Sequence, residues 1–304
     1  MSIIEVKNLT KDFGRGRGVF DVSFTVQKGE VFGFLGPNGA GKTTTMRHLM
    51  GFSQPQAGQT SILSKDCWSK HHEIKDSIGY LPGEISVPNH LNGAGFIKQM
   101  ADFRKIKDLT YAKELTERFS LDTSIKLNRM SLGTKRKLAI VTAFLHDPDV
   151  LLLDEPTGGL DPLMQDNFIQ FIKEEKKRGK TILLSSHIFS EVDATCDKIT
   201  IIKDGKLVST FLADEIKHNA RKEWKVEFAS IGDLEQFCQG SQNIFDVSLV
   251  KKESNQVHVV FYDKDANRFM AELSTHKVKF FSEIKFTLEN YFMKFYGKEA
   301  ESHA

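Results

Sequence analysis

One short segment limits the folds open to this chain more than any other feature. Residues 36–43 read Gly-Pro-Asn-Gly-Ala-Gly-Lys-Thr, which fills the pattern G-x-x-x-x-G-K-[ST] of a phosphate-binding loop. The segment comes directly after the apolar stretch 31–35 and directly before a helix expected over 43–50. A strand that runs through such a loop into a helix surrounds an anion with backbone N–H groups. We therefore expect an α/β protein that binds a nucleotide phosphate.

The residue types in this segment suit an anion. We expect Gly36, Gly39 and Gly41 to take positive φ, which lets the backbone approach a phosphate closely. Lys42 supplies a point charge for the β- and γ-phosphates, and the hydroxyl of Thr43 can ligate Mg²⁺. The predicted phosphate-binding set is Gly36, Pro37, Asn38, Gly39, Ala40, Gly41, Lys42, Thr43 and Thr44.

Two further apolar stretches end in side chains that can do chemistry. Residues 150–153 lead to Asp154, and residues 181–184 lead to His187. Open α/β sheets bind ligands at the carboxyl ends of their strands, so we expect both at the phosphate loop. Asp154 is predicted to be a second Mg²⁺ contact, through water, and Glu155 to deprotonate the water that attacks the γ-phosphate. His187 is a candidate hydrogen bond to that phosphate or water, while a lone histidine is more often structural.

Hydrophobic periodicity predicts two units. Apolar strands alternate with helices over residues 1–215, which indicates a mixed, largely parallel sheet covered on both faces, with a helical subdomain at about 85–147. After residue 215 the pattern changes to half-exposed strands and short helices. Their order, βαββαβ, predicts a small α+β ferredoxin-like domain over 216–304.

Composition excludes several functional classes. The formal net charge is only +2, and no block of five or six like charges occurs, so no nucleic-acid partner is expected. The three cysteines are far apart and lack metal-ligand spacing, so we expect reduced thiols. No apolar run approaches the roughly 18 to 20 residues of a membrane helix, and the N-terminus is no signal peptide. A role at a membrane would therefore be that of a peripheral subunit.

The order of these segments resembles the ATP-binding cassette (ABC) ATPases. The phosphate loop is followed by Asp154-Glu155-Pro156-Thr157, Gly158-Gly159-Leu160-Asp161 and Ser185-Ser186-His187, and the match spans about residues 3–212. The resemblance implies a P-loop NTPase fold and the ligands ATP and Mg²⁺. It also implies that Phe13 stacks on adenine, that Asp161 is the D-loop aspartate facing the other monomer, and that His187 is the switch histidine.

Two segments depart from the family pattern. Met130-Ser131-Leu132-Gly133-Thr134-Lys135 stands in place of the signature Leu-Ser-Gly-Gly-Gln, which in this family touches the γ-phosphate bound to the opposite subunit. Ser131 and Gly133 match the family signature, whereas Leu132 and Thr134 differ from it. We expect Ser131 to cap the following helix, and the basic run 135–137 to be a solvated helix face.

The second departure is a Q-loop without its glutamine. The segment Ile78-Gly79-Tyr80-Leu81-Pro82-Gly83-Glu84 has Gly83 where that side chain would reach Mg²⁺. We hypothesise that Glu84, the next residue in the chain, takes the place of the missing glutamine.

These features predict an ATPase subunit of an ABC transporter, with an ABC-2 type exporter favoured. One phosphate loop and one signature imply a dimer, with an identical or a paralogous second cassette, and a separate transmembrane permease. Localisation is then cytoplasmic, on the inner face of the membrane. The stretch 287–292 is similar to the tail of ABC-2 exporter ATPases. The alternative is a soluble ABC ATPase acting on ribosomes or nucleic acid; a P-loop kinase or GTPase is a weaker one.

The C-terminal segment is rich in aromatic residues, and we call these residues the aromatic tail. They form either part of a packed core or a docking surface for a partner. The aromatic tail comprises Phe280, Phe281, Phe286, Tyr291, Phe292, Phe295 and Tyr296.

Overall fold

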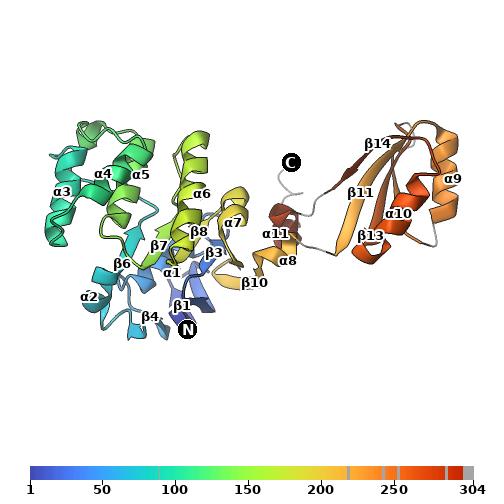
Figure 1. Ribbon diagram of the computed structural model, residues 1–304. Helices are drawn as coiled ribbons and strands as arrows, with labels where there is room; N and C mark the ends of the chain where they lie inside the picture. Colours follow the sequence, from blue (N-terminus) through green and yellow to red (C-terminus); the bar gives the residue numbers. More distant parts are fainter. Residues whose placement is uncertain (89, 218–219, 242–243, 252–253, 285–286, 297–304) are drawn as a thin grey trace. The chain divides into compact units, whose positions relative to one another are not determined.

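The chain forms two compact units, Met1–Ala213 and Asp214–Ala304 (Figure 1). The division lies two residues before the boundary expected from the sequence. The computed structural model describes the whole chain except residues 89, 218–219, 242–243, 252–253, 285–286 and 297–304.

A six-stranded sheet forms the centre of the first unit. From edge to edge its strands are β10 (Lys206–Leu212), β9 (Lys198–Lys203), β3 (Val31–Leu35), β8 (Thr181–Ser186), β7 (Val150–Asp154) and β6 (Ile78–Leu81). All neighbours run parallel except β10, which pairs antiparallel with β9. Every residue of β3, β7 and β8 is buried, as the continuous apolar runs predicted. The mixed sheet is confirmed, and its parallel strands bring their carboxyl ends to one edge.

A smaller antiparallel sheet packs against the central one. Its order is β2 (Gly18–Gln27), β1 (Ser2–Asp12), β4 (Ala57–Ile62) and β5 (Lys65–Asp66). Helix α1 (Lys42–Leu49) contributes Met46 to the core that these two sheets share. In that core the ring of Phe24 on β2 stacks on Phe32 of β3, with the ring centroids 5.2 Å apart. The antiparallel sheet thereby supports the strand that enters the phosphate loop.

Three helices form the predicted helical subdomain, drawn in teal to green in Figure 1: α3 (Gly93–Phe103), α4 (Thr110–Arg118) and α5 (Leu132–Phe144). The other helices of the first unit are α2 (His71–Ile74), α6 (Pro162–Lys177) and α7 (Phe189–Thr195), with short 3₁₀ turns at Lys75–Ser77 and Leu127–Arg129. Helix α3 starts at the Asn92 cap, whose side chain accepts from the Gly95 N–H.

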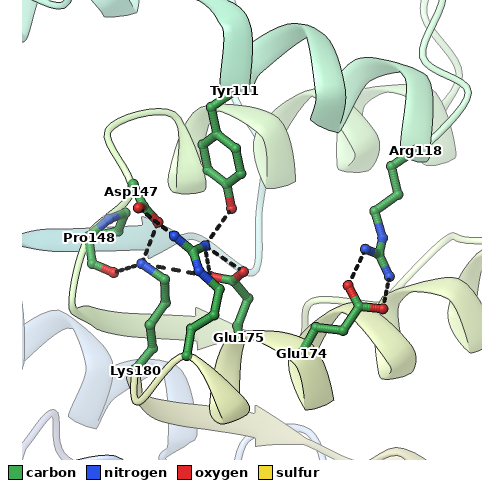
Figure 2. A network of polar contacts seen from close by, with 8 residues as sticks. Tyr111, Arg118, Asp147, Pro148, Glu174, Glu175 and Lys180 are labelled. Carbon is green, nitrogen blue, oxygen red and sulfur yellow. Dashed lines mark hydrogen bonds and ion pairs between the residues drawn. The ribbon is translucent and has the colours of Figure 1, made fainter.

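A polar network joins α4 of this subdomain to α6 (Figure 2). Arg118 on α4 donates two hydrogen bonds to the Glu174 carboxylate. Arg178, just after α6, donates to Glu175, to Asp147 and to the Tyr111 hydroxyl of α4. The buried Lys180 ammonium lies 2.6 Å from an Asp147 oxygen and donates to the Pro148 carbonyl. The network therefore fixes the helical subdomain to the layer that carries β7 and β8.

The second unit follows α8 (Ala213–Lys217), which crosses the boundary. Its elements are β11 (Arg221–Phe228), α9 (Ile231–Ser241), β12 (Asp246–Lys251), β13 (Gln256–Tyr262), α10 (Ala266–Leu273), β14 (Val278–Glu283) and α11 (Leu288–Tyr296), with a 3₁₀ turn at Asp263–Asp265. The order βαββαβ is confirmed, and the antiparallel sheet runs β12-β13-β11-β14. Residues of α9 and α10 pack with one face of this sheet in a single apolar core (Figure 1).

The aromatic tail divides between core and surface. Phe292 of α11 is buried, while Phe280 and Phe281 of β14 are about half exposed. Phe281 stacks on Trp224 at 5.5 Å, and Tyr291 meets Phe295 edge-on. Phe286 and the side chain of Tyr296 lie outside the described residues.

Candidate ATP site

The phosphate loop folds tightly around the Lys42 ammonium. This group donates to the Gly36 carbonyl at 2.6 Å and to the Pro37 carbonyl at 3.0 Å. Gly41 caps α1 with φ of 111°, and Gly39 has φ of 81°. Both are left-handed conformations that favour glycine, as predicted. The loop exposes Pro37, Asn38, Gly39 and Thr43, buries Gly36, Ala40, Gly41 and Lys42, and half-buries Thr44.

Gly36 is required for a reason that the sequence pattern did not indicate. Its φ is not positive, so the prediction of a left-handed conformation at this position is wrong. A Cβ at Gly36 would instead lie 2.5 Å from the Ile202 carbonyl oxygen of β9. The first glycine of the loop therefore permits close packing on the neighbouring strand, rather than an unusual backbone angle.

Asp154 ends β7 at the edge of the sheet where the loop lies. Its side chain is fully buried, and Oδ1 accepts a short hydrogen bond from the Ser185 hydroxyl of β8. Oδ2 is buried without a hydrogen-bond partner. A buried carboxylate oxygen with a free lone pair is costly unless it ligates a cation. Asp154 therefore fits a cation such as the Mg²⁺ that accompanies a nucleotide. Thr43, the other predicted ligand, is exposed at the start of α1.

Glu155 turns away from Asp154 because its backbone is left-handed, with φ of 50°. One carboxylate oxygen, Oε1, lies 2.9 Å from the Lys42 ammonium. The other, Oε2, lies 2.6 Å from Nδ1 of His187. The sheet edge thus brings together the loop lysine, the acid after β7 and the histidine after β8, as their positions after apolar strands predicted. A protonated Nδ1 donates to the carboxylate and orients it.

Sequence reasoning missed a third acid at this edge, Glu191 on α7. It is buried and accepts a 2.5 Å hydrogen bond from the Ser186 hydroxyl beside His187. Burial raises the pKa of Glu191 to about 7; hydrogen bonds from Ser186 and Thr157 oppose this change. A glutamate on a short helix is usually solvated, so only its position four residues after the histidine could have marked it.

The signature-like segment begins α5 as expected. Ser131 is the N-cap, and its hydroxyl accepts from the Thr134 N–H at 3.1 Å. Leu132 is largely exposed. Gly133 packs so closely that a Cβ there would lie 2.7 Å from the Gly159 carbonyl. The helix N-terminus therefore lies against the segment that follows Glu155.

The expectation that residues 135–137 form a solvated face is wrong for Arg136. Its side chain is only 4% exposed, whereas Lys135 and Lys137 are half-buried. The guanidinium donates to the carbonyls of Gly158, Pro82 and Gly83 at 3.0, 2.9 and 2.7 Å. A basic residue type indicated solvent, but the carbonyls that bind it come from segments distant in sequence.

Position 83 faces the Asp154 carboxylate. A Cβ built at Gly83 would lie 3.0 Å from Asp154 Oδ2, so a longer side chain there would meet this carboxylate. Glu84 is exposed, and no hydrogen bond or ion pair among the described residues joins it to Asp154. Its role as a replacement for the glutamine stays a prediction.

Comparisons with known proteins assign the family. The ABC transporter family model matches residues 19–158. The bacitracin transport ATP-binding protein BcrA of Bacillus licheniformis is 35% identical over 73% of each chain. The ABC transporter ATP-binding protein YtrB of Bacillus subtilis (strain 168) is 32% identical over 97% of this chain and 99% of its own length. This chain belongs to the ABC transporter ATP-binding proteins.

Solved ABC structures share the fold of the first unit. An ATP-binding subunit of an ABC transporter aligns with a TM-score of 0.65 and 30% identity, over 71% of this chain and 92% of its own. A bacterial ABC cassette solved as a dimer aligns with a TM-score of 0.63 and 22% identity, over 69% and 99%. The chain is thus an ABC subunit that binds and hydrolyses ATP, and proteins of this family work as dimers with transmembrane partners.

The remaining residues implied by the ABC resemblance lie on loops of the first unit. Phe13 follows β1 and is 55% exposed, so it is available for stacking rather than packed in the core. Asp161 caps α6, and its carboxylate accepts from the Met164 N–H. In the described part of the chain, no helix combines the length and apolar character that a membrane span requires.

Proposed function

We propose that this chain powers an exporter by hydrolysing MgATP at the edge formed by β3, β7 and β8. The observation that carries the proposal is the Glu155 carboxylate, which lies between the Lys42 ammonium and the His187 ring. A base held between a phosphate-binding lysine and an orienting histidine suits attack of water on a γ-phosphate.

The proposed reaction assigns one task to each group. Lys42 and the loop N–H groups hold the β- and γ-phosphates. Glu155 takes a proton from water while the water oxygen forms a bond to the γ-phosphorus. The bond between the γ-phosphorus and the bridging oxygen breaks, and that oxygen leaves with ADP. His187 keeps the Glu155 carboxylate in place and hydrogen-bonds the γ-phosphate. Phe13 stacks on the adenine ring.

Magnesium is the proposed counter-ion of the nucleotide. Thr43 and Asp154 would hold it, Asp154 through the Oδ2 atom that has no other partner or through a water on that atom. Bound there, the ion neutralises charge on the β- and γ-phosphates.

The proposed active unit contains two cassettes, identical or paralogous. Each chain has one phosphate loop and one signature-like helix start. Ser131, Leu132 and Gly133 of one cassette would face the γ-phosphate held by the other, because a helix N-terminus binds anions. Asp161 would lie at the junction between the two monomers.

The export role and the permease rest on relatives and on composition. BcrA is named for bacitracin transport, and this chain aligns with 73% of it. We propose a separate transmembrane permease as partner and a location on the cytoplasmic, inner face of the cell membrane.

Affinity purification from detergent-solubilised membranes of the native host tests this proposal. We expect a polytopic membrane protein in stoichiometric amount, and ATPase activity in the purified complex. Recovery of ribosomes or nucleic acid instead would overturn the transporter function and favour a soluble ABC ATPase. The Glu155→Gln variant, purified in the same way, should lower ATP turnover by about 10² to 10⁴-fold and retain the partner.

A further inference from the structure

Two loops of the proposed site and the signature helix meet at one buried cation, the guanidinium of Arg136. It lies on α5, just over one turn from the signature serine Ser131, and donates to the carbonyls of Pro82, Gly83 and Gly158. The first two follow β6, and the third follows Glu155. One side chain therefore joins the signature helix to the loop beside the metal carboxylate and to the loop after the base.

The glycines of the loops bound by Arg136 pack closely against the site, with little room for a side chain. A Cβ at Gly158 would lie 3.4 Å from the Arg136 guanidinium and 3.3 Å from the Glu155 carbonyl. A Cβ at Gly83 would lie 3.0 Å from Asp154 Oδ2. A shift of the guanidinium therefore displaces backbone that touches both Asp154 and Glu155.

Charge explains why an arginine is tolerated there. Burial lowers the pKa of Arg136, and the carboxylates of Asp154, Glu155 and Glu191 oppose this change. Among the described residues the guanidinium donates only to carbonyls, and the negative charge of these carboxylates favours its charged form without a direct ion pair. Its fork of N–H donors reaches three acceptors at once, which a lysine ammonium with its compact charge cannot do.

We propose that Arg136 is a positioning residue for ATP hydrolysis, which holds the Gly83 and Gly158 loops in register with the signature helix. The missing Q-loop glutamine gives this contact its importance. Because Gly83 has no side chain, its backbone is what lies against Asp154, and Arg136 holds that backbone. Contact between the cassettes at Ser131 is thereby passed to the metal carboxylate and to the base.

The inference rests on the proposed function. The ATPase activity of the purified chain and its variants tests the role of Arg136 and the proposed function separately. The variants are Arg136→Lys, which keeps the charge, Arg136→Ala, which leaves a cavity lined by carbonyls, and Lys137→Gln as the matched control on the same helix. We expect Arg136→Lys to lower kcat by about 10²-fold with little change in KM for MgATP, because small misplacements of reacting groups cost rates of this order. Lys137→Gln should match the wild type.

Chemical rescue distinguishes positioning from a loss of folded protein. Free guanidinium at millimolar concentration should restore part of the kcat of Arg136→Ala and leave the wild type unchanged. ATP-binding stoichiometry corrects every rate for the folded fraction. A wild-type kcat in Arg136→Lys, or a corrected kcat of wild-type size in Arg136→Ala, overturns the inference. A wild-type chain that hydrolyses no ATP overturns the proposed function instead.

Discussion

The two units of this protein bury very different side chains. The core of the cassette, Met1–Ala213, contains charged groups at the sheet edge, including Lys42, Arg136, Asp154 and Glu191. The described core of the C-terminal unit is apolar, and Ser241 is its one buried polar side chain. Its phenylalanines pack directly, as in the stacked pair Phe261 and Phe269 at 4.4 Å.

The difference shows what each unit is built to do. Buried charges are costly and persist where chemistry or a precise geometry requires them. An apolar core needs only shape and stabilises a fold without specifying chemistry. Substitutions in the cassette should therefore change activity or pH dependence, and substitutions in the C-terminal unit should change stability alone.

The largest effect that would sharpen this contrast is expected at Glu155. Glu155→Gln keeps the shape of the side chain but removes the base, so kcat should fall by about 10² to 10⁴-fold. Steady-state phosphate release measures the rate, and Glu114→Gln on the exposed face of α4 is the control. An unchanged rate would show that another group deprotonates the water.

A cavity in the C-terminal unit should affect only stability. Phe269 is fully buried, so Phe269→Ala is expected to destabilise that unit by about 3–5 kcal/mol and to leave ATP hydrolysis intact. Trp224 packs against Phe269, so its fluorescence during urea unfolding, in a Trp68→Phe background, reports this unit.

The control for that cavity is Phe280→Ala. The ring of Phe280 is 51% exposed, so this change should stay within about 0.5 kcal/mol. Loss of ATPase activity in Phe269→Ala, with the cassette still folded, would contradict the separation of roles.

Glu191 should give the cassette a pH dependence that the C-terminal core lacks. The folded state raises the pKa of Glu191 from 4.5 to about 7, mainly through burial. The stability that its protonated form contributes is fully present below about pH 4.5 and is lost as pH rises to about 7, since the unfolded chain ionises first. Glu191→Gln cannot ionise and still accepts from Ser186, so at pH 8 it should be more stable than the wild type by about 1–3 kcal/mol.

Urea unfolding at pH 5 and pH 8 measures this difference. Trp68 in a Trp224→Phe background reports the cassette. Parallel pH profiles for the wild type and Glu191→Gln would show that the carboxyl of Glu191 does not titrate in this range.

The smallest effect is expected at the surface of the network in Figure 2. Arg118 and Glu174 form a bidentate pair, but Glu174 is 54% exposed, so solvent screens it. A double-mutant cycle with Arg118→Gln and Glu174→Gln should give a coupling of about 0.2–1 kcal/mol, which falls at high salt. A coupling well above this range would place a strong ion pair at the surface and weaken the contrast with the buried charges.

Much of the fold could be predicted because its signals are local. Continuous apolar runs predicted β3, β7 and β8, and alternation predicted the half-exposed strand β11. The phosphate loop and Glu155 were identified because the spacing of a loop and the end of a strand are properties of consecutive residues. The start of α5 at Ser131 follows equally from local capping.

Other features depend on partners that are distant along the chain. Gly36 is a glycine because β9 passes beside it, and Arg136 is buried because Pro82, Gly83 and Gly158 place their carbonyls around it. The raised pKa of Glu191 likewise reflects its burial beside Ser186.

The sequence by itself determined the α/β core, the phosphate loop and the residues at the strand ends, since each depends on neighbours in the chain. Only the tertiary structure decided which charged side chains are buried and what they bind. The physical reason is that desolvation and carbonyl contacts depend on packing between segments, which residue type and spacing do not encode.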